Sequence, residues 1–207
     1  MLKLLKNRQR EKIIRAVEQG DLDVIAKYLK GKPADELNQP IDEEHSLSEI
    51  AIHAGQEKAL NLLLGAGANP NARTRDNVPL LFCALLSNHS LGLVSELLKA
   101  GADVLALHPH TQENIVIYCI KHCPPERLML HLNRLHQYGA SLSAADPSGK
   151  TVLDYALATQ DRNLLQFLVM SGAPTPQEWS TDLDADLRDF LVRCVSDLHI
   201  RQMFLNQ

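Results

Sequence analysis

Cysteine and histidine side chains gather in one short segment of the chain, "CIKHC", where they have the chemistry to hold a metal ion. The segment contains Cys119, His122 and Cys123, and His108 and His110 lie a short distance before it. A structural zinc site requires four such ligands that converge on one point. The chain has four cysteines and no paired CxxC spacing, so we expect reduced thiols and no disulfide framework.

The sequence lacks the patterns of known catalytic machinery. It contains no glycine-rich phosphate loop, no nucleophile elbow and no HExxH motif. A net charge of −4 and an aromatic content of 4% argue against a nucleic-acid binder. No apolar run approaches the ~18 residues of a membrane span, and the N-terminal segment lacks a signal-peptide core. We therefore expect a cytoplasmic protein that is not an enzyme, needs no cofactor and binds neither nucleic acid nor membrane.

Glycines recur along the chain at a spacing typical of stacked repeats. Gly67, Gly101, Gly139 and Gly172 are separated by 34, 38 and 33 residues, and each follows an apolar run with helical character. A glycine at this place supplies the left-handed residue that ends a helix. The period predicts that each copy ends with a helix and a glycine turn.

Small residues recur in phase with these glycines. Ala51, Ala84, Cys119 and Ala156 each stand between larger apolar residues and are separated by 33, 35 and 37 positions. A small side chain there would let a helix of the next copy approach closely. An earlier copy fits the same frame with Ala16 at the small site, so five copies emerge.

The best copy, "DPSGKTVLDYALATQDRNLLQFLVMSGA", resembles the ankyrin-repeat family. The matching residues are Asp146, Gly149, Thr151, Leu153, Ala156, Leu168 and Gly172. The resemblance implies an all-α, right-stacked ankyrin-repeat solenoid of about five repeats with helical caps. The single expected domain spans 1–207, with an N-terminal capping repeat at 1–40, repeats at 41–73, 74–107, 108–145 and 146–174, and a C-terminal helical cap at 175–207.

The sequence departs from the family pattern in two ways. The family's histidine is replaced in every copy, by Glu49, Phe82, Ile117 and Asp154, so we expect a less regular stack than a consensus array. The copy at 108–145 has four extra residues around "CPPERL". Because prolines end helices, we expect a longer loop between its two helices.

Both ends of a stacked array need caps with one polar face. The N-terminal helix is expected to turn Ile13, Ile14 and Val17 inward and its basic residues outward. Trp179 is expected to pack over the last repeat. The C-terminal segment is expected to form one or two closing helices through Leu187, Phe190, Leu191, Cys194, Leu198 and Phe204.

The resemblance also implies where a protein partner would bind: at the hairpin tips and the exposed ends of the first helices, which line a concave face. Acidic residues predominate on the early copies of this face, and basic residues or histidines on the later ones, which would steer a partner of opposite pattern. We expect a monomer. The positions are Asp42, Glu43, His45, His53, Arg75, Asp76, Ser87, His108, His110, Lys121, His122, Ser148, Lys150 and Thr159.

Other functions stay open beside this one. Cys119 falls at the small core position of its copy, so it cannot face the same ligand as His122, and we expect no metal there. The alternative is a regulatory protein in which His108, His110, His122 and Cys123 hold an ion, or one whose partner binding changes between about pH 5.5 and 7.5 as histidines titrate. A further alternative is a secreted bacterial effector that binds a host protein.

Overall fold

The computed structural model describes residues 2–42 and 45–205, with the side chains of 7–42 and 45–204. Within these ranges the regular structure is helical, apart from one isolated β-bridge between Arg73 and Pro79. The chain forms two compact units, Met1–Thr111 and Gln112–Gln207. The predicted all-α class is thus confirmed for the described residues.

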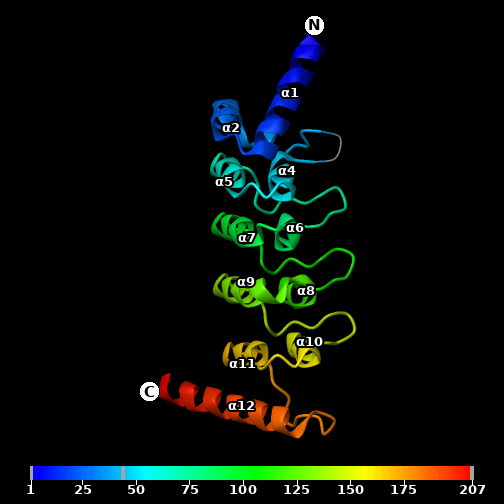
Figure 1. Ribbon diagram of the computed structural model, residues 1–207, viewed down its shortest axis with the longest axis vertical. Coiled ribbons are helices and arrows are strands. Elements are labelled where there is room, and N and C mark those ends of the chain that lie inside the picture. The colour runs from blue at the N-terminus through cyan, green and yellow to red at the C-terminus, as the bar shows by residue number, and fades with distance from the viewer. Residues whose placement is uncertain (1, 43–44, 206–207) are drawn as a thin grey trace. The chain divides into compact units, whose positions relative to one another are not determined.

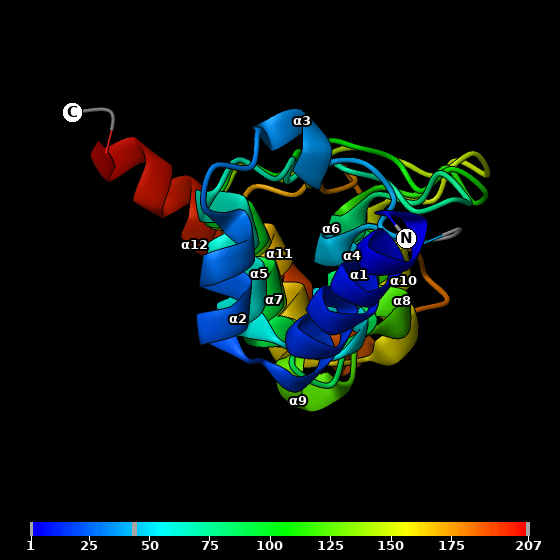
Figure 2. The same cartoon turned by 90° about the horizontal axis from the view of Figure 1, so that it is seen from above.

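The first unit is built from paired helices that stack in two columns (Figure 1). One column contains α1, α4 and α6, and the other contains α2, α5 and α7; Figure 2 shows the same columns from above. Each helix contacts both its partner in the pair and the next helix in its column. The bounds are α1 (Leu2–Gln19), α2 (Leu22–Leu29), α3 (Ala34–Leu37), α4 (Leu47–His53), α5 (Glu57–Gly65), α6 (Leu80–Leu86) and α7 (Ser90–Lys99).

The second unit continues the pattern of paired helices. α8 packs on α9 and α10, and α11 packs on α10 and α12. The α10 helix begins with a capping box in which Thr151 Oγ1 accepts a hydrogen bond from Asp154 N, and Asp154 Oδ2 accepts one from Thr151 N. The bounds are α8 (Ile115–His122), α9 (Pro125–Gln137), α10 (Val152–Thr159), α11 (Arg162–Met170) and α12 (Ala185–Leu205).

The residues that define the period have the predicted roles. Ala51, Ala84, Cys119 and Ala156 are all completely buried, as close helix packing requires. Gly67 has a φ of 101°, and the next residue, Ala68, donates its N–H to Leu63 O at 3.0 Å, which ends α5. Apolar burial at this spacing accounts for the core of each unit.

The expected long loop in the copy at 108–145 is wrong. Only Cys123 and Pro124 separate α8 from α9, and the loop between α6 and α7 is no shorter. Pro125 is instead the first residue of α9, where its fixed φ suits a helix start and its missing N–H costs nothing. The extra residues lengthen α9 to 13 residues, compared with 9 in α5 and α11.

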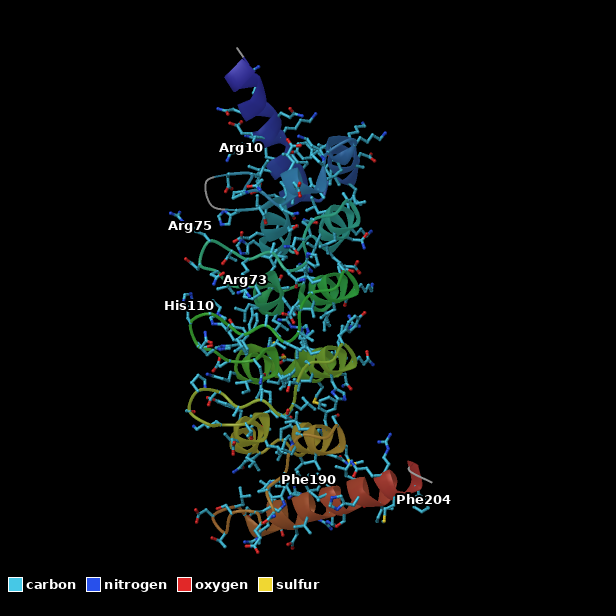
Figure 3. The ribbon with its side chains drawn as sticks, turned by 180° about the vertical axis from the view of Figure 1, so that it is seen from behind. Arg10, Arg73, Arg75, His110, Phe190 and Phe204 are labelled. Carbon is cyan, nitrogen blue, oxygen red and sulfur yellow. The ribbon has the colours of Figure 1, made fainter. Side chains whose placement is uncertain are left out.

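The helices at the two ends of the chain bury only some of the residues expected to face inward. Ile13 and Val17 are buried, whereas Ile14 is only half-buried. On α12, Leu187, Leu191 and Cys194 are buried, whereas Phe190 and Leu198 are half-buried. Phe204, expected to face inward, is 74% exposed, because α12 continues beyond the residues that α11 covers (Figure 3).

Two glycines in the first unit leave room for side chains of a neighbouring copy. A Cβ on Gly55, which has a φ of 69°, would lie 2.3 Å from His89 Cδ2. A Cβ on Gly92 would lie 1.9 Å from Glu57 Oε2. The helix pairs α4–α5 and α6–α7 therefore each leave room for a side chain of the other.

Candidate protein-binding surface

The turn between α5 and α6 holds Arg75 and Asp76 at its exposed tip. Thr74 N donates to Val78 O at 2.9 Å, and Thr74 Oγ1 accepts from Val78 N at 3.2 Å. Arg73 closes the turn by donating from its guanidinium to Asn77 O at 2.9 Å. Figure 3 shows Arg75 at the outer end of this loop and His110 at the outer end of the following one. These hydrogen bonds shape the turn and leave its tip facing solvent.

Asparagine joins this turn to the next copy. Asn71 Nδ2 donates to Gly101 O at 3.2 Å, and Asn71 Oδ1 accepts from Asp103 N at 2.6 Å. The side chain thus fixes the distance between two neighbouring loops.

The histidines at the next tip contact one another. The rings of His108 and His110 have centroids 5.7 Å apart, and His108 also packs edge-on against Phe82 at 5.5 Å. His108 is half-buried, and His110 is exposed. His108 therefore helps to pack the loop, while His110 is the residue presented to solvent.

The turn before α10 is organised by Asp146. Its Oδ1 accepts hydrogen bonds from Ser148 N, Ser148 Oγ and Lys150 N at 2.8, 2.7 and 2.9 Å, and its Oδ2 accepts from Tyr155 Oη at 2.5 Å. Led by the Tyr155 bond, these donors lower the pKa of Asp146 to about 2. The same bond to Asp146 raises the pKa of Tyr155 to about 12. Ser148 and Lys150 are exposed on this rigid turn.

Lys121 has a structural partner. Its ammonium forms an ion pair with the Glu113 carboxylate, whose side chain is 4% exposed, and also lies 5.4 Å from the centre of the Tyr155 ring. A buried carboxylate needs such a countercharge. His122, beside it, is exposed, and its ring centroid lies 4.4 Å from that of Tyr118. Of these two predicted surface residues, Lys121 thus also stabilises its unit.

Two open cavities in the first unit are lined in part by predicted residues. One, of about 640 Å³, is lined by His53 and Ser87 with Cys83 and His89 among others. The other, of about 460 Å³, is lined by Arg75 with Glu49, Arg73 and Ser46 among others. Thr159, in the second unit, is exposed, and its hydroxyl donates to Ala156 O at 2.7 Å.

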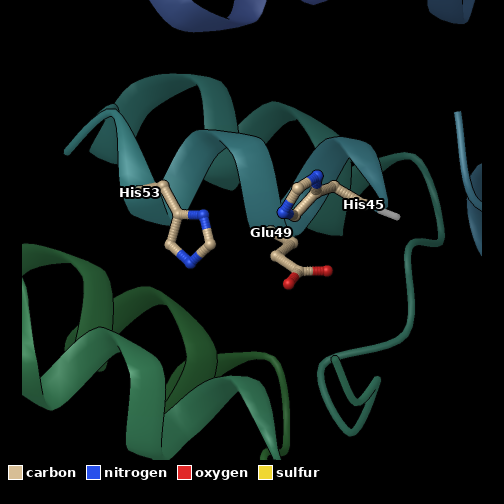
Figure 4. Close-up of side chains that lie close together, drawn as sticks. All are labelled: His45, Glu49 and His53. Atoms are coloured by element: carbon tan, nitrogen blue, oxygen red, sulfur yellow. The ribbon is translucent and has the colours of Figure 1, made fainter. Parts of the chain in front are cut away.

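The residues His45, Glu49 and His53 form a cluster on one side of α4 (Figure 4). One potential ligand atom from each lies within 4.8 Å of the others. Both histidines were predicted as partner contacts, with Asp42, whose Oδ1 is 3.5 Å from His45 Nδ1. Glu49 was noted only as a replacement of the family's histidine. The spacing of four residues between the three was the signal that would have found the cluster.

The predicted Glu43 lies outside the described residues.

In the structure, the two cysteines of the segment "CIKHC" contact each other, in contrast to the metal site considered from the sequence. Cys119 Sγ and Cys123 Sγ lie 3.4 Å apart in the core. Cys119 donates to Cys123, which raises the pKa of Cys119 and lowers the pKa of Cys123. Within the described residues, the group with three ligands in reach of one another is the one on α4, and it contains none of His108, His110, His122 and Cys123. The two thiols thus form a hydrogen-bonded pair in the core.

Paired helices joined by hydrogen-bonded turns define a protein of helical repeats. The ankyrin-repeat family model matches residues 46–75, which cover α4, α5 and the start of the following turn. This match confirms the resemblance and supports an ankyrin-repeat family for the chain. No curated protein matches the sequence. Among the described residues, no helix is both long and apolar enough to cross a bilayer.

Proposed function

We propose that this chain is a non-catalytic module that binds a protein partner through its turns and the exposed ends of its first helices. Ankyrin repeats are generally protein-protein interaction modules. The observation that carries the proposal is the construction of the turns: internal hydrogen bonds hold them, while their charged tip residues point to solvent. Arg75 and Asp76 in the first unit and Lys150 in the second are such residues. Preformed tips lose little conformational entropy on binding, which favours affinity.

The proposed surface offers charges of both signs. The first unit contributes Asp42, Arg75 and Asp76, and the second contributes Lys121 and Lys150. A partner with matching charges would be steered to these tips, and its association rate would fall as salt screens the attraction. The proposed location is cytoplasmic, and the proposed active form is a monomer.

The experiment is an affinity capture from native lysate that compares the wild-type protein with an Arg75→Glu/Lys150→Glu variant. Lys121→Glu is unsuitable, because it would place a second carboxylate against the buried Glu113. The matched control is Lys27→Glu/Lys58→Glu, which makes the same change of charge on the exposed sides of α2 and α5.

We expect a protein captured by the wild type and by the control to be lost with the tip variant, while all three proteins unfold at the same temperature. Measurement of the association rate at two salt concentrations would then test the steering. Equal capture by the tip variant, or loss only with the control, would contradict binding through the tips.

A further inference from the structure

We propose that His45, Glu49 and His53 form a zinc-binding site in the first unit. The inference is independent of the proposed protein binding, because it depends only on donor atoms within this chain. Two imidazoles and one carboxylate are donors that suit zinc. No part of the ankyrin-repeat pattern requires these three residues together.

The backbone brings the three side chains to one side of α4. Glu49 and His53 are four residues apart on the helix, so their side chains share a face. His45 precedes the helix, and its backbone is fixed there by two hydrogen bonds: its N–H donates to Asp42 Oδ1 at 2.5 Å, and its carbonyl accepts from Ile41 N at 2.8 Å. The two rings meet edge to face with centroids 5.7 Å apart, and Figure 4 shows a ring nitrogen of each directed toward the space between them.

The carboxylate of Glu49 is the acidic donor of the proposed site. Glu49 is 5% exposed as a whole residue, and it borders the open cavity that Arg73 and Arg75 also line. Burial of a charged carboxylate is costly unless a cation or hydrogen-bond donors compensate it. Arg73 lines the same cavity, but its guanidinium donates to Asn77 O. A metal ion between Glu49 and the two histidines would place a positive charge directly beside this carboxylate.

Asp42 is placed to orient one of the ligands. Its Oδ1 lies 3.5 Å from His45 Nδ1. A carboxylate that accepts from one ring nitrogen of a histidine fixes the proton there and leaves the other nitrogen to bind metal. With Nδ1 of His45 turned to Asp42, Nε2 is the ligand atom. Asp42 is therefore a positioning residue.

The geometry requires a small closure around the ion. Zinc binds nitrogen and oxygen at about 2.0–2.2 Å, so tetrahedral ligand atoms lie roughly 3.3 Å apart. The three donors lie within 4.8 Å, and His53 is exposed while His45 is half-buried, so both rings have room to turn inward. Three protein ligands leave a fourth position for water.

The test is a titration of zinc chloride into tag-free full-length protein, in competition with a chromophoric chelator. We expect one zinc ion per chain for the wild type, and affinity at least about tenfold weaker in His53→Ala and in Glu49→Gln. Asp42→Asn is expected to weaken binding by about tenfold while the stoichiometry stays the same. Circular dichroism of each variant without metal shows whether its helices are intact.

The controls separate this site from the "CIKHC" segment. His110→Ala and His122→Ala/Cys123→Ser are expected to bind zinc like the wild type. With cobalt in place of zinc, the spectrum is expected to lack a thiolate charge-transfer band, since no cysteine is a ligand. Failure of the wild type to bind zinc, undiminished binding by His53→Ala, or loss of binding in His122→Ala/Cys123→Ser would each overturn the proposal.

Discussion

His131 is a buried histidine whose titration couples stability to pH. Its side chain is 1% exposed, and burial, followed by the charges of Arg127 and Arg134, lowers its pKa from 6.5 to about 4. As the pH falls below about 6.5, the unfolded chain takes up this proton before the folded chain does, so stability is lost until about pH 4. The free energy of unfolding should fall by roughly 2–3 kcal/mol across this window on account of His131 alone.

Denaturant unfolding at several pH values would measure this effect. In His131→Leu, the loss of stability between about pH 6.5 and 4 should be smaller than in the wild type by that amount. Other groups titrate equally in both proteins, so the difference isolates His131. Parallel pH profiles would contradict the assignment.

Tyr155 and Asp146 form the second residue-scale pair that can be tested. Removal of the hydroxyl in Tyr155→Phe should raise the pKa of Asp146 from about 2 toward its ordinary 3.8, because the Tyr155 bond is the main cause of the shift. An NMR titration of the carboxyl carbon measures this. Ser148→Ala removes a weaker contributor and should raise the pKa less; the reverse order would be inconsistent with the geometry.

At the scale of elements, Asn71 connects two successive turns of the first unit. In Asn71→Ala, both hydrogen bonds to the next copy are lost, and the free energy of unfolding should fall by about 1 kcal/mol. Asn133→Ala is a matched control, since Asn133 donates only within its own helix, to Met129 O at 2.8 Å. Chemical denaturation compares the two variants. Equal losses would show that the link between copies adds nothing.

Sequence reasoning predicted the helices well because each copy repeats the same local requirements. A small residue such as Ala84 and a turn glycine such as Gly67 have one physical role wherever they recur. Pro125 was misjudged because proline is compatible with two outcomes, a loop or the first turn of a helix, and only packing of α9 decides between them.

The candidate surface was harder to predict than the helices. Lys121 was identified as a surface residue, but its pairing with the buried Glu113 depends on contacts that no repeat pattern contains. The burial of Glu49 was not predicted for the same reason. A carboxylate at the position where the family has histidine is typical of a polar surface residue. The repeat pattern cannot specify the contacts of side chains that depart from it.

At the scale of the whole molecule, the two compact units should respond separately to damage. Leu63 in the first unit and Leu165 in the second are completely buried. Each Leu→Ala change should lower the free energy of unfolding by about 2–4 kcal/mol. In repeat proteins each repeat contacts only its neighbours, so the loss of stability stays close to the substituted residue. Hydrogen exchange should therefore quicken mainly within 1–111 for Leu63→Ala and within 112–207 for Leu165→Ala. Uniform quickening along the chain would indicate one cooperative unit instead.

The reciprocal fit at Gly55 and Gly92 bears on how such a gene can change. Copies with identical faces can be duplicated, deleted or exchanged by recombination, because any copy fits beside any other. Here His89 occupies space above Gly55, and Glu57 occupies space above Gly92, across the same pair of copies. A side chain at Gly55 would meet the His89 ring and a strained backbone, whereas the flexible Glu57 side chain could move away from one at Gly92. We therefore expect exchange of either copy by recombination to be disfavoured wherever it would replace Gly55.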